Sequence, residues 1–259
     1  MNHDRLQRLA IAPTQLQDGQ VCLTRQQQHY LGRVLRLQAG DRFMAMNGQG
    51  TWWLCELLAA ATAKIIETIP VQTELPVAVT LMVALPKGNG FDNIVRCCTE
   101  LGVSSIIPVV SDRTLLKPSS QKLTRWRRIA DEAAEQSERQ ILPGLLEPVA
   151  FATALSDFTS AKLENNLLRS QAEPGNKGKY ICVARGESPH LLDSLQDCSQ
   201  EKIVIATGPE RGWTEAEVAR AIGCGFQPVS LGLRILRAVT APIVALSIVA
   251  AAWESKLEN

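Results

Sequence analysis

The segment 202–244 constrains the fold more than any other part of the chain, because it reads as strand, turn, helix, strand and turn. Its first five residues, KIVIA, are rich in β-branched side chains, which is typical of a strand buried on both faces of a parallel sheet. The strand ends at Thr207–Gly212, where two glycines and a proline bend the backbone. Thr214 and Glu217 then form a capping box, which predicts a helix ending at Gly223 or Gly225. The segment therefore predicts an α/β fold.

A second turn of the same kind follows. Residues 226–231 read as a strand, and residues 232–237 form the turn between this strand and another helix. Ligands of open α/β sheets bind outside the carboxyl ends of the strands, so two such turns in one unit predict a ligand site. One glycine-containing turn alone would indicate only an ordinary connection. The chain lacks G-x-x-x-x-G-K-[ST] and a helix-opening G-x-G-x-x-G, which argues against a triphosphate and a Rossmann dinucleotide.

Length and composition limit the class of protein. With 259 residues, 46% of them hydrophobic, the chain is long enough for one large or two modest domains. A net charge of +1 gives no global attraction to nucleic acid, so any affinity for RNA requires a local basic patch. The seven cysteines form no C-x-x-C pair, which predicts neither a disulfide framework nor a metal site and fits a reducing cytoplasm.

No membrane segment is predicted. Residues 1–20 are polar and lack the apolar core of a signal peptide. The longest apolar run, 238–253, is shorter than the roughly 20 residues that a membrane span needs, and we expect it to form a buried helix.

The chain divides into two predicted domains. Residues 1–72 contain several short strands and the hairpin signal Asn47–Gly50, which predict a small β-barrel. A polar stretch bracketed by prolines, 70–76, reads as the linker. Residues 77–259 carry the α/β pattern. Its early part includes strands at 79–85 and 105–110, a helix from Phe91 that Gly102 closes, and a long helix from Ser119 or Ser120 through Gln140.

Two regions are candidates for contact with RNA. Residues 29–36, HYLGRVLR, combine basic and aromatic side chains, the mixture expected where a protein binds phosphates and stacks bases. A solvated helix face with an aromatic anchor is the alternative. The loop 86–90 carries Lys87, whose ammonium group is suited to a phosphate. The long helix that follows has cations near its start, which indicates either an anionic partner or a solvated charged face.

Several motifs resemble one known family. Thr207-Gly208-Pro209-Glu210, Gly212, Ser230-Leu231-Gly232 and Arg234-Ile235-Leu236-Arg237 are similar to the cofactor signature of the RsmE family, the 16S ribosomal RNA uridine N3-methyltransferases. The resemblance also covers the run from Thr99 to Val109, the motif Glu135-Gln136-Ser137 with Arg139, and His29 with Val34-Leu35-Arg36. Two positions depart from the family pattern: Arg211 replaces a glycine, and Val239 replaces a glutamate that many members carry.

The resemblance implies a fold and a cofactor. It implies a PUA-like N-terminal domain that helps to grip RNA, and a C-terminal domain of the SPOUT class, whose chain threads a trefoil knot. The methyl donor would be S-adenosyl-L-methionine. The residues that would hold the donor are Thr207, Gly208, Pro209, Glu210, Gly212, Leu231, Gly232, Ile235, Leu236 and Thr240. The residues that would contact RNA are His29, Arg33, Arg36, Lys87 and Arg139.

The chemistry suggests the catalytic residues. Uracil N3 carries a proton at neutral pH, so a site that methylates N3 needs a general base or cations that stabilise the anion on O2 and O4. Arg234 and Arg237 lie three residues apart and are expected to share a face, and Glu210 is the nearest carboxylate for a base. The alternatives are a helix-capping role for Arg237 and a turn role for Glu210.

The expected partners are 16S ribosomal RNA in the small ribosomal subunit and a second copy of the chain. The final helix, 241–253, is apolar nearly all round, which predicts burial against a second subunit and hence a homodimer. Two other functions stay open. One is methylation of transfer RNA or of another ribosomal site. The other is a ribosome-associated RNA-binding protein without catalysis, suggested by Arg211 and Val239.

Overall fold

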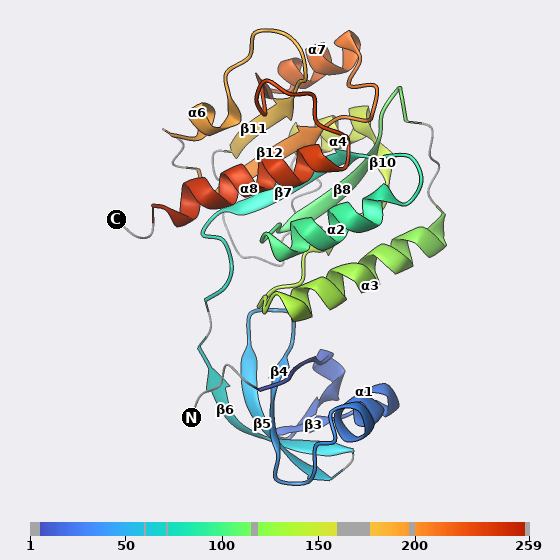
Figure 1. Cartoon of the computed structure of the whole chain (residues 1–259), viewed down its shortest axis with the longest axis vertical. Coiled ribbons are helices and arrows are strands. Elements are labelled where there is room, and N and C mark those ends of the chain that lie inside the picture. The colour runs from blue at the N-terminus through green and yellow to red at the C-terminus, as the bar shows by residue number, and fades with distance from the viewer. Residues whose placement is uncertain are drawn as a thin grey trace. The chain divides into compact units, whose positions relative to one another are not determined.

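The computed structural model describes residues 6–59, 61–70, 72–114, 119–159, 177–196 and 200–256. The chain forms two compact units, coloured along the chain in Figure 1. The first unit contains Met1–Glu74 and Ala134–Leu142, and the second contains Leu75–Ala133 and Pro143–Asn259. The structure thus assigns to the first unit a later segment, 134–142, that the sequence-based division did not place there.

The first unit is built on a curled β-sheet. Its strands among the described residues, in spatial order, are β1 (Arg8–Ala10), β4 (Arg42–Met46), β5 (Trp52–Ala59), β6 (Thr62–Ile69), β3 (Gln20–Cys22) and β2 (Leu16–Gln17). Strands β4, β5 and β6 pair antiparallel, and β1 pairs parallel with β4. Asn47 makes the predicted hairpin turn between β4 and β5, because its Oδ1 accepts the N–H groups of Gln49 and Thr51.

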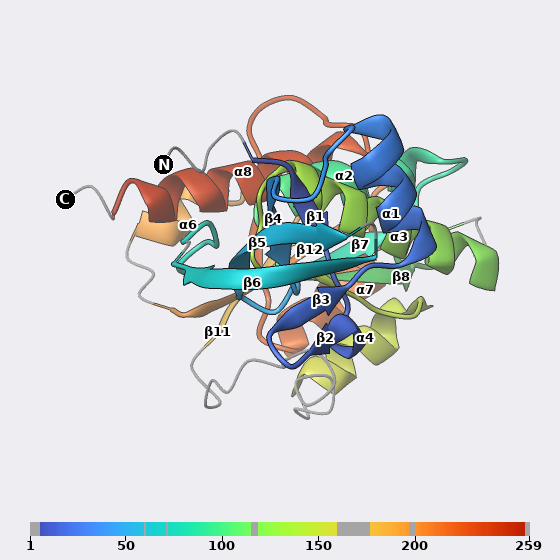
Figure 2. The same ribbon diagram turned by 90° about the horizontal axis from the view of Figure 1, so that it is seen from below.

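A short helical segment covers part of this sheet (Figure 2). Helix α1 (Arg25–His29) begins with a capping box in which Thr24 accepts the Gln27 N–H, and it continues into a π-helical turn, η3 (Tyr30–Val34). Arg36 ends the segment with φ of +59°, and the Leu37 N–H donates to the Leu31 carbonyl at 2.9 Å. This is the left-handed termination that usually takes a glycine.

The second unit contains a parallel sheet. Its strands in spatial order are β10 (Val149–Ala150), β8 (Ser105–Val110), β7 (Ala78–Ala84), β12 (Lys202–Thr207), β11 (Lys177–Cys182) and β13 (Gln227–Val229), with β9 (Gly144–Leu145) also paired to β8. Each recorded pairing in this sheet is parallel, so the strands end at one common edge. Strand β12 is buried along its whole length between β7 and β11, as the sequence predicted.

Helices cover both faces of the parallel sheet (Figure 1). The helices of this unit are α2 (Gly90–Glu100), α3 (Ser120–Gln136), which extends into the segment assigned to the first unit, α4 (Phe151–Thr159), α6 (Leu191–Gln196), α7 (Glu215–Gly223) and α8 (Thr240–Glu254). Residues of α2, α6 and α8 pack with the alternate side chains Val79, Leu81 and Val83 of β7. Residues of α4 and α7 pack with Met82 and Ala84 on the opposite face. The α/β class with a parallel sheet is therefore confirmed.

Helix α8 packs extensively inside its own unit. Its buried residues include Ala245, Leu246, Val249 and Trp253, and it contacts α2, α6, β7 and β12. Much of the apolar surface of this helix is therefore covered within the chain, and its burial against a second subunit stays a prediction. The trefoil knot also stays a prediction. No helix among the described residues is long and apolar enough to cross a membrane.

The predicted extent of the long helix is wrong at its end. Helix α3 ends at Gln136 rather than Gln140. Glu138 has φ of +60°, which leaves the helical region, and Glu74 Oε1 accepts the N–H groups of Gln140 and Ile141. A carboxylate distant in sequence thus takes two N–H groups that a longer helix would have used.

Candidate active site at the carboxyl edge of the parallel sheet

The first turn of the site follows β12. Thr207 is fully buried at the end of the strand, and its Oγ1 has no hydrogen-bond partner among the described residues. The Gly212 N–H donates to the Pro209 carbonyl at 2.8 Å, which closes the turn. Gly212 has φ of +70°, whereas Arg211 is not among the residues with positive φ. Only the second of these two positions therefore requires glycine, and an arginine fits the first without backbone strain.

Gly208 lies against an aromatic ring that the sequence analysis did not select. A Cβ atom at Gly208 would lie 3.2 to 3.3 Å from three atoms of the Trp213 indole. The indole stacks on Phe151 of α4, with the ring centroids 4.2 Å apart. Gly208 therefore has little room for a side chain, which explains why glycine occupies this position.

Residues of the loop after β8 stabilise this turn through hydrogen bonds. Arg113 Nη1 donates to the Arg211 carbonyl at 2.7 Å. Glu217, 2% exposed, accepts the Asp112 N–H at 2.9 Å and the Thr214 N–H at 2.8 Å. The capping box predicted the contact with Thr214 but not the contacts to residues 112 and 113. No local pattern could predict those, because about a hundred residues separate the partners.

The second turn of the site follows β13. Ser230 is bonded on both sides of its backbone: its N–H donates to the Pro189 carbonyl at 2.8 Å, and its carbonyl accepts the Leu191 N–H at 2.9 Å. The Gly232 N–H donates to Ser230 Oγ at 3.1 Å. Gly232 has φ of +112°, and no atom lies within 4 Å of where its Cβ would be. This glycine is needed for its conformation and leaves open space beside the turn.

Arg234 and Arg237 lie in the second turn, as the sequence predicted, and whether they share a face stays a prediction. Residues 231–237 form no helix, and α8 begins at Thr240. Both arginines are exposed, and the Arg237 carbonyl accepts the N–H groups of Thr240 and Ala241 at the start of α8. Helical spacing does not apply to an irregular segment, so sequence separation says nothing about how the two guanidinium groups converge.

The apolar residues of this segment differ in exposure. Leu233 is 100% exposed and Ile235 is 66% exposed, while Leu231 packs partly buried against the core of the unit and Leu236 is half-buried. Ile235 and Leu236, the predicted apolar walls of the donor site, therefore stand at the surface of the carboxyl edge. The exposed apolar side chains, next to two arginines, suit a flat ring system better than a small ion.

The loop after β7 contacts the first turn, and the start of α2 that follows it lies close to Val239, between the second turn and α8. The Lys87 N–H donates to Glu210 Oε1 at 2.7 Å. At the start of α2, a Cβ atom on Gly90 would lie 2.7 Å from Val239 Cγ2. Val239, a departure from the family pattern, therefore packs closely against the loop after β7. Three loops that are far apart in sequence thus meet at one edge of the sheet.

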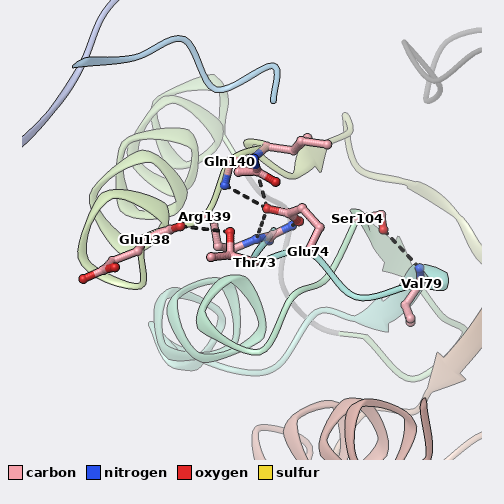
Figure 3. A network of polar contacts seen from close by, with 8 residues as sticks. Thr73, Glu74, Val79, Ser104, Glu138, Arg139 and Gln140 are labelled. Atoms are coloured by element: carbon pink, nitrogen blue, oxygen red, sulfur yellow. Dashed lines mark hydrogen bonds and ion pairs between the residues drawn. The ribbon is translucent and has the colours of Figure 1, made fainter. Parts of the chain in front are cut away.

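The predicted RNA contacts fall into two groups. His29, Arg33 and Arg36 are exposed on α1, η3 and the residues after them, and Lys87 is exposed in the second unit. Arg139 is different, because it is 3% exposed and forms an ion pair with Glu74 (Figure 3). A guanidinium buried against a carboxylate in its own unit is poorly placed to bind a phosphate. Arg139 is therefore not among the proposed RNA contacts.

The site has the features that a bound nucleoside would need. Gly208 and Gly232 carry no side chain over the backbone of the two turns, Thr207 supplies a buried hydroxyl with no hydrogen-bond partner in the described part of the chain, and Ile235 supplies apolar surface. The buried cysteines do not add a nucleophile, because burial raises the pKa of Cys55 to about 12 and also raises the pKa of Cys98. Among the described residues, no group of three His, Cys, Asp or Glu side chains could hold a metal ion.

Comparison with known families matches almost the whole chain. Residues 73–250 match the family model described as an RNA methyltransferase domain, and residues 23–70 match the model described as an RNA methyltransferase PUA domain. Both turns of the site lie within the first match.

Individual proteins give the same result. The chain is 50% identical to the ribosomal RNA small subunit methyltransferase E of Synechocystis, over 96% of this chain and 78% of the relative. It is 32% identical to the protein of the same name from Bacillus subtilis, over 87% of each. The crystal structure of ribosomal RNA small subunit methyltransferase E from Neisseria gonorrhoeae bound to S-adenosyl methionine superposes with a TM-score of 0.79, at 29% identity, covering 96% of this chain and 98% of that one.

Proposed function

Because this chain belongs to the ribosomal RNA small subunit methyltransferase E family, we propose that it methylates N3 of one uridine in the decoding region of 16S ribosomal RNA, with S-adenosylmethionine as donor. The observation that carries this proposal is the pair of glycine-containing turns, 207–212 and 230–237, at the carboxyl edge of the parallel sheet. This is the place where open α/β sheets bind their ligands.

The donor is proposed to bind between these two turns. S-adenosylmethionine, when bound, supplies a sulfonium methyl group that a nucleophile can displace. Backbone groups of the first turn would hold the donor, with Leu231, Gly232, Ile235, Leu236 and Thr240 as the contribution of the second turn and the start of α8. Gly232 supports this assignment, since a Cβ atom added there would meet no atom within 4 Å.

The acceptor is proposed to lose its proton with the help of cations. The N3 proton of uracil must leave as the bond from N3 to the methyl carbon forms, and it passes to water or to a base. Arg234 and Arg237, both exposed beside the donor turn, are our candidates to stabilise the negative charge on O2 and O4 or to hold a phosphate. Glu210, the third predicted catalytic residue, already accepts the Lys87 N–H through Oε1.

RNA is proposed to be held by both units. We propose residues 1–72 as the PUA-like RNA-binding part and residues 77–259 as the SPOUT methyltransferase part. The exposed side chains of His29, Arg33, Arg36 and Lys87 are the proposed contacts. We also propose that the protein is a homodimer that acts in the cytoplasm on the small ribosomal subunit. Light scattering at micromolar concentration tests the dimer, and a monomer would contradict it.

Calorimetric titration with S-adenosylmethionine tests the donor site. Wild type is expected to bind, and Gly232→Trp is expected not to bind, because φ of +112° disfavours any side chain and the indole would fill the space beside the turn. Gly223→Trp is the control, since a Cβ there meets no atom within 4 Å and its φ is not positive. Binding by Gly232→Trp would overturn this location. Binding by Arg211→Gly alone would mean that Arg211 blocks the pocket, which would favour a non-catalytic RNA-binding protein.

Methyl transfer to separated RNA pools tests the substrate. We expect radioactive methyl to enter 16S ribosomal RNA and not transfer RNA, and nucleoside analysis to identify 3-methyluridine. Methylation confined to transfer RNA, or a methyl group on a different atom, would contradict the proposed substrate while leaving the donor site intact.

A further inference from the structure

The loop after β7, residues 85–89, is held by hydrogen bonds to three other elements, the first of which is β8, where the Val109 carbonyl accepts the Leu85 N–H at 3.0 Å. The Lys87 N–H donates to Glu210 Oε1 at 2.7 Å, from the turn after β12. Lys122 Nζ of α3 donates to the Gly88 carbonyl at 3.4 Å. Pro86 is buried, and Gly90 meets Val239 just after the loop. Of these contacts, the one to Glu210 alone is a hydrogen bond between the loop and a proposed donor-binding turn.

The position of Glu210 follows from the turn that carries it. Strands β7 and β12 are direct neighbours, with Val83 opposite Thr207, so the segments that leave them start side by side. The tight turn between Pro209 and Gly212 projects the exposed Glu210 side chain toward the backbone of residue 87. The bond joins two residues 123 positions apart.

The loop needs such a contact to hold one conformation. Residues 86–90 contain two glycines, and Gly88 has φ of +68°, a conformation that side chains rarely adopt. Lys87 and Gly88 are exposed, so little apolar burial fixes them. A charged acceptor for the Lys87 N–H therefore determines where the backbone of this residue lies and, through it, where the ammonium group projects.

We propose that Glu210 is a positioning residue and not the general base: its carboxylate fixes the loop 85–89 through the Lys87 N–H and so places the Lys87 ammonium for a phosphate of the RNA substrate. The phosphate contact rests on the proposed methyl transfer to RNA. The bond between Glu210 and the loop does not, so the two can fail separately. The role requires only an oxygen that accepts a hydrogen bond, whereas a base must also take a proton.

This difference makes Glu210→Gln the decisive variant. The amide oxygen of glutamine accepts the Lys87 N–H but is not a base at neutral pH. We expect Glu210→Gln to keep kcat within about twofold of wild type and to keep the same pH profile, since one hydrogen bond of ordinary strength is preserved. We expect Glu210→Ala to raise KM for RNA roughly fivefold, the factor that loss of about 1 kcal/mol produces. A large fall in kcat of Glu210→Gln, with loss of the acidic limb of the pH profile, would overturn the proposal.

Lys87→Ala tests whether the effect passes through the lysine side chain. This variant removes the ammonium group and keeps the N–H, so it should raise KM for RNA to a similar extent. Adding Glu210→Ala to Lys87→Ala should then have little further effect, because the positioned group is already absent. Fully additive losses would mean that Glu210 acts independently of Lys87, contrary to the proposal. Glu187→Ala, an exposed carboxylate in the loop after β11, is the control and should match wild type.

Amide exchange at Lys87 tests the contact without any activity. We expect the Lys87 N–H to exchange with deuterium faster in Glu210→Ala than in wild type, and at the wild-type rate in Glu210→Gln and Glu187→Ala. An unchanged rate in Glu210→Ala would overturn the proposal. If wild type methylates no RNA while Glu210→Ala speeds this exchange, the proposed function fails and the positioning contact stands.

Discussion

Arg211 and Val239 are the two residues at which this chain departs from its family's pattern, and the structure gives each a physical account. Arg211 lacks the positive φ that its neighbour Gly212 has, so a side chain is tolerated there. Val239 packs partly buried against the core of the unit and next to Gly90. Neither residue has a positive φ. Both substitutions are therefore compatible with the predicted donor site.

Gly90 is expected to tolerate no side chain while Val239 is present. Gly90→Ala would place a Cβ 2.7 Å from Val239 Cγ2, and relief of such overpacking costs about 1–3 kcal/mol. We expect a lower melting temperature and weaker binding of S-adenosylmethionine. Val239→Ala removes the contacting methyl groups, so the double variant should be more stable than Gly90→Ala alone. Gly223→Ala, with open space around its Cβ, is the control. A double variant no more stable than Gly90→Ala would refute the steric explanation.

Arg36 occupies a backbone position that normally takes glycine. Its φ of +59° disfavours a branched or long side chain, yet the sequence places a cation there. Backbone strain of this kind persists where the surrounding structure or the function requires it. The combination of strain and exposed charge supports the proposed role of Arg36 in binding RNA.

Arg36→Gly is expected to stabilise the protein and weaken its function. Glycine relieves the left-handed strain, so we expect the free energy of unfolding to rise by about 0.5 kcal/mol. Affinity for a 16S RNA fragment should fall, because the guanidinium is lost. Arg36→Ala should lose the same affinity with no gain in stability. Urea unfolding and filter binding at fixed salt measure both quantities. An Arg36→Gly variant less stable than Arg36→Ala would contradict this account.

At the scale of elements, the end of helix α3 is determined by a residue from a different part of the chain. Glu74 pairs with Arg139 and also accepts the N–H groups of Gln140 and Ile141, and Thr73 Oγ1 donates to the Glu138 carbonyl (Figure 3). These contacts bind the segment 134–142 to the end of the stretch Met1–Glu74, which belongs to the same unit. The stretch that reads as a linker in sequence is thus partly fixed by hydrogen bonds.

A double-mutant cycle tests this network. Arg139→Ala leaves the Glu74 carboxylate without its partner, and breaking a buried pair from one side costs about 3–5 kcal/mol. Glu74→Ala should be destabilising for the same reason. The double variant should lose about 2 kcal/mol less free energy of unfolding than the two single variants lose together, because no unpaired charge remains. Arg128→Ala, which breaks an exposed pair with Glu132, should change the free energy of unfolding by less than about 0.5 kcal/mol. Additive effects at Arg139 and Glu74 would rule out the coupling.

For the whole molecule, a net charge of +1 means that RNA must be bound through local groups of cations. The proposed contacts come from both units, Arg33 from the first and Lys87 from the second. Long-range attraction contributes little to such a protein, so each contact should be visible in the salt dependence of binding.

The salt dependence of RNA binding measures how many of these contacts exist. Each phosphate contact on single-stranded RNA contributes about 0.7 to the slope of the logarithm of affinity against the logarithm of salt concentration. We expect Arg33→Ala and Lys87→Ala each to reduce the slope by about 0.7. Lys64→Ala, an exposed cation outside the proposed surface, should leave the slope unchanged. An unchanged slope in Arg33→Ala or Lys87→Ala would remove that residue from the proposed RNA surface.

The sequence by itself determined the elements and the class of the fold. The buried strand at 202–206, the capping box at Thr214 and the hairpin at Asn47 were all predicted, because each depends on residues within a few positions of one another. The need for glycine in the two turns is also local, because it follows from the positive φ values of Gly212 and Gly232. The family resemblance rested on these same short motifs.

The tertiary structure alone decided which distant groups meet. It placed Lys87 against Glu210, Arg113 against the backbone of residue 211, and Glu74 against Arg139. It also ended helix α3 at Gln136. These outcomes depend on hydrogen bonds and packing between segments separated by tens to more than a hundred residues. Periodicity and propensity describe only neighbours in sequence, so contacts of this kind leave no pattern that a single sequence reveals.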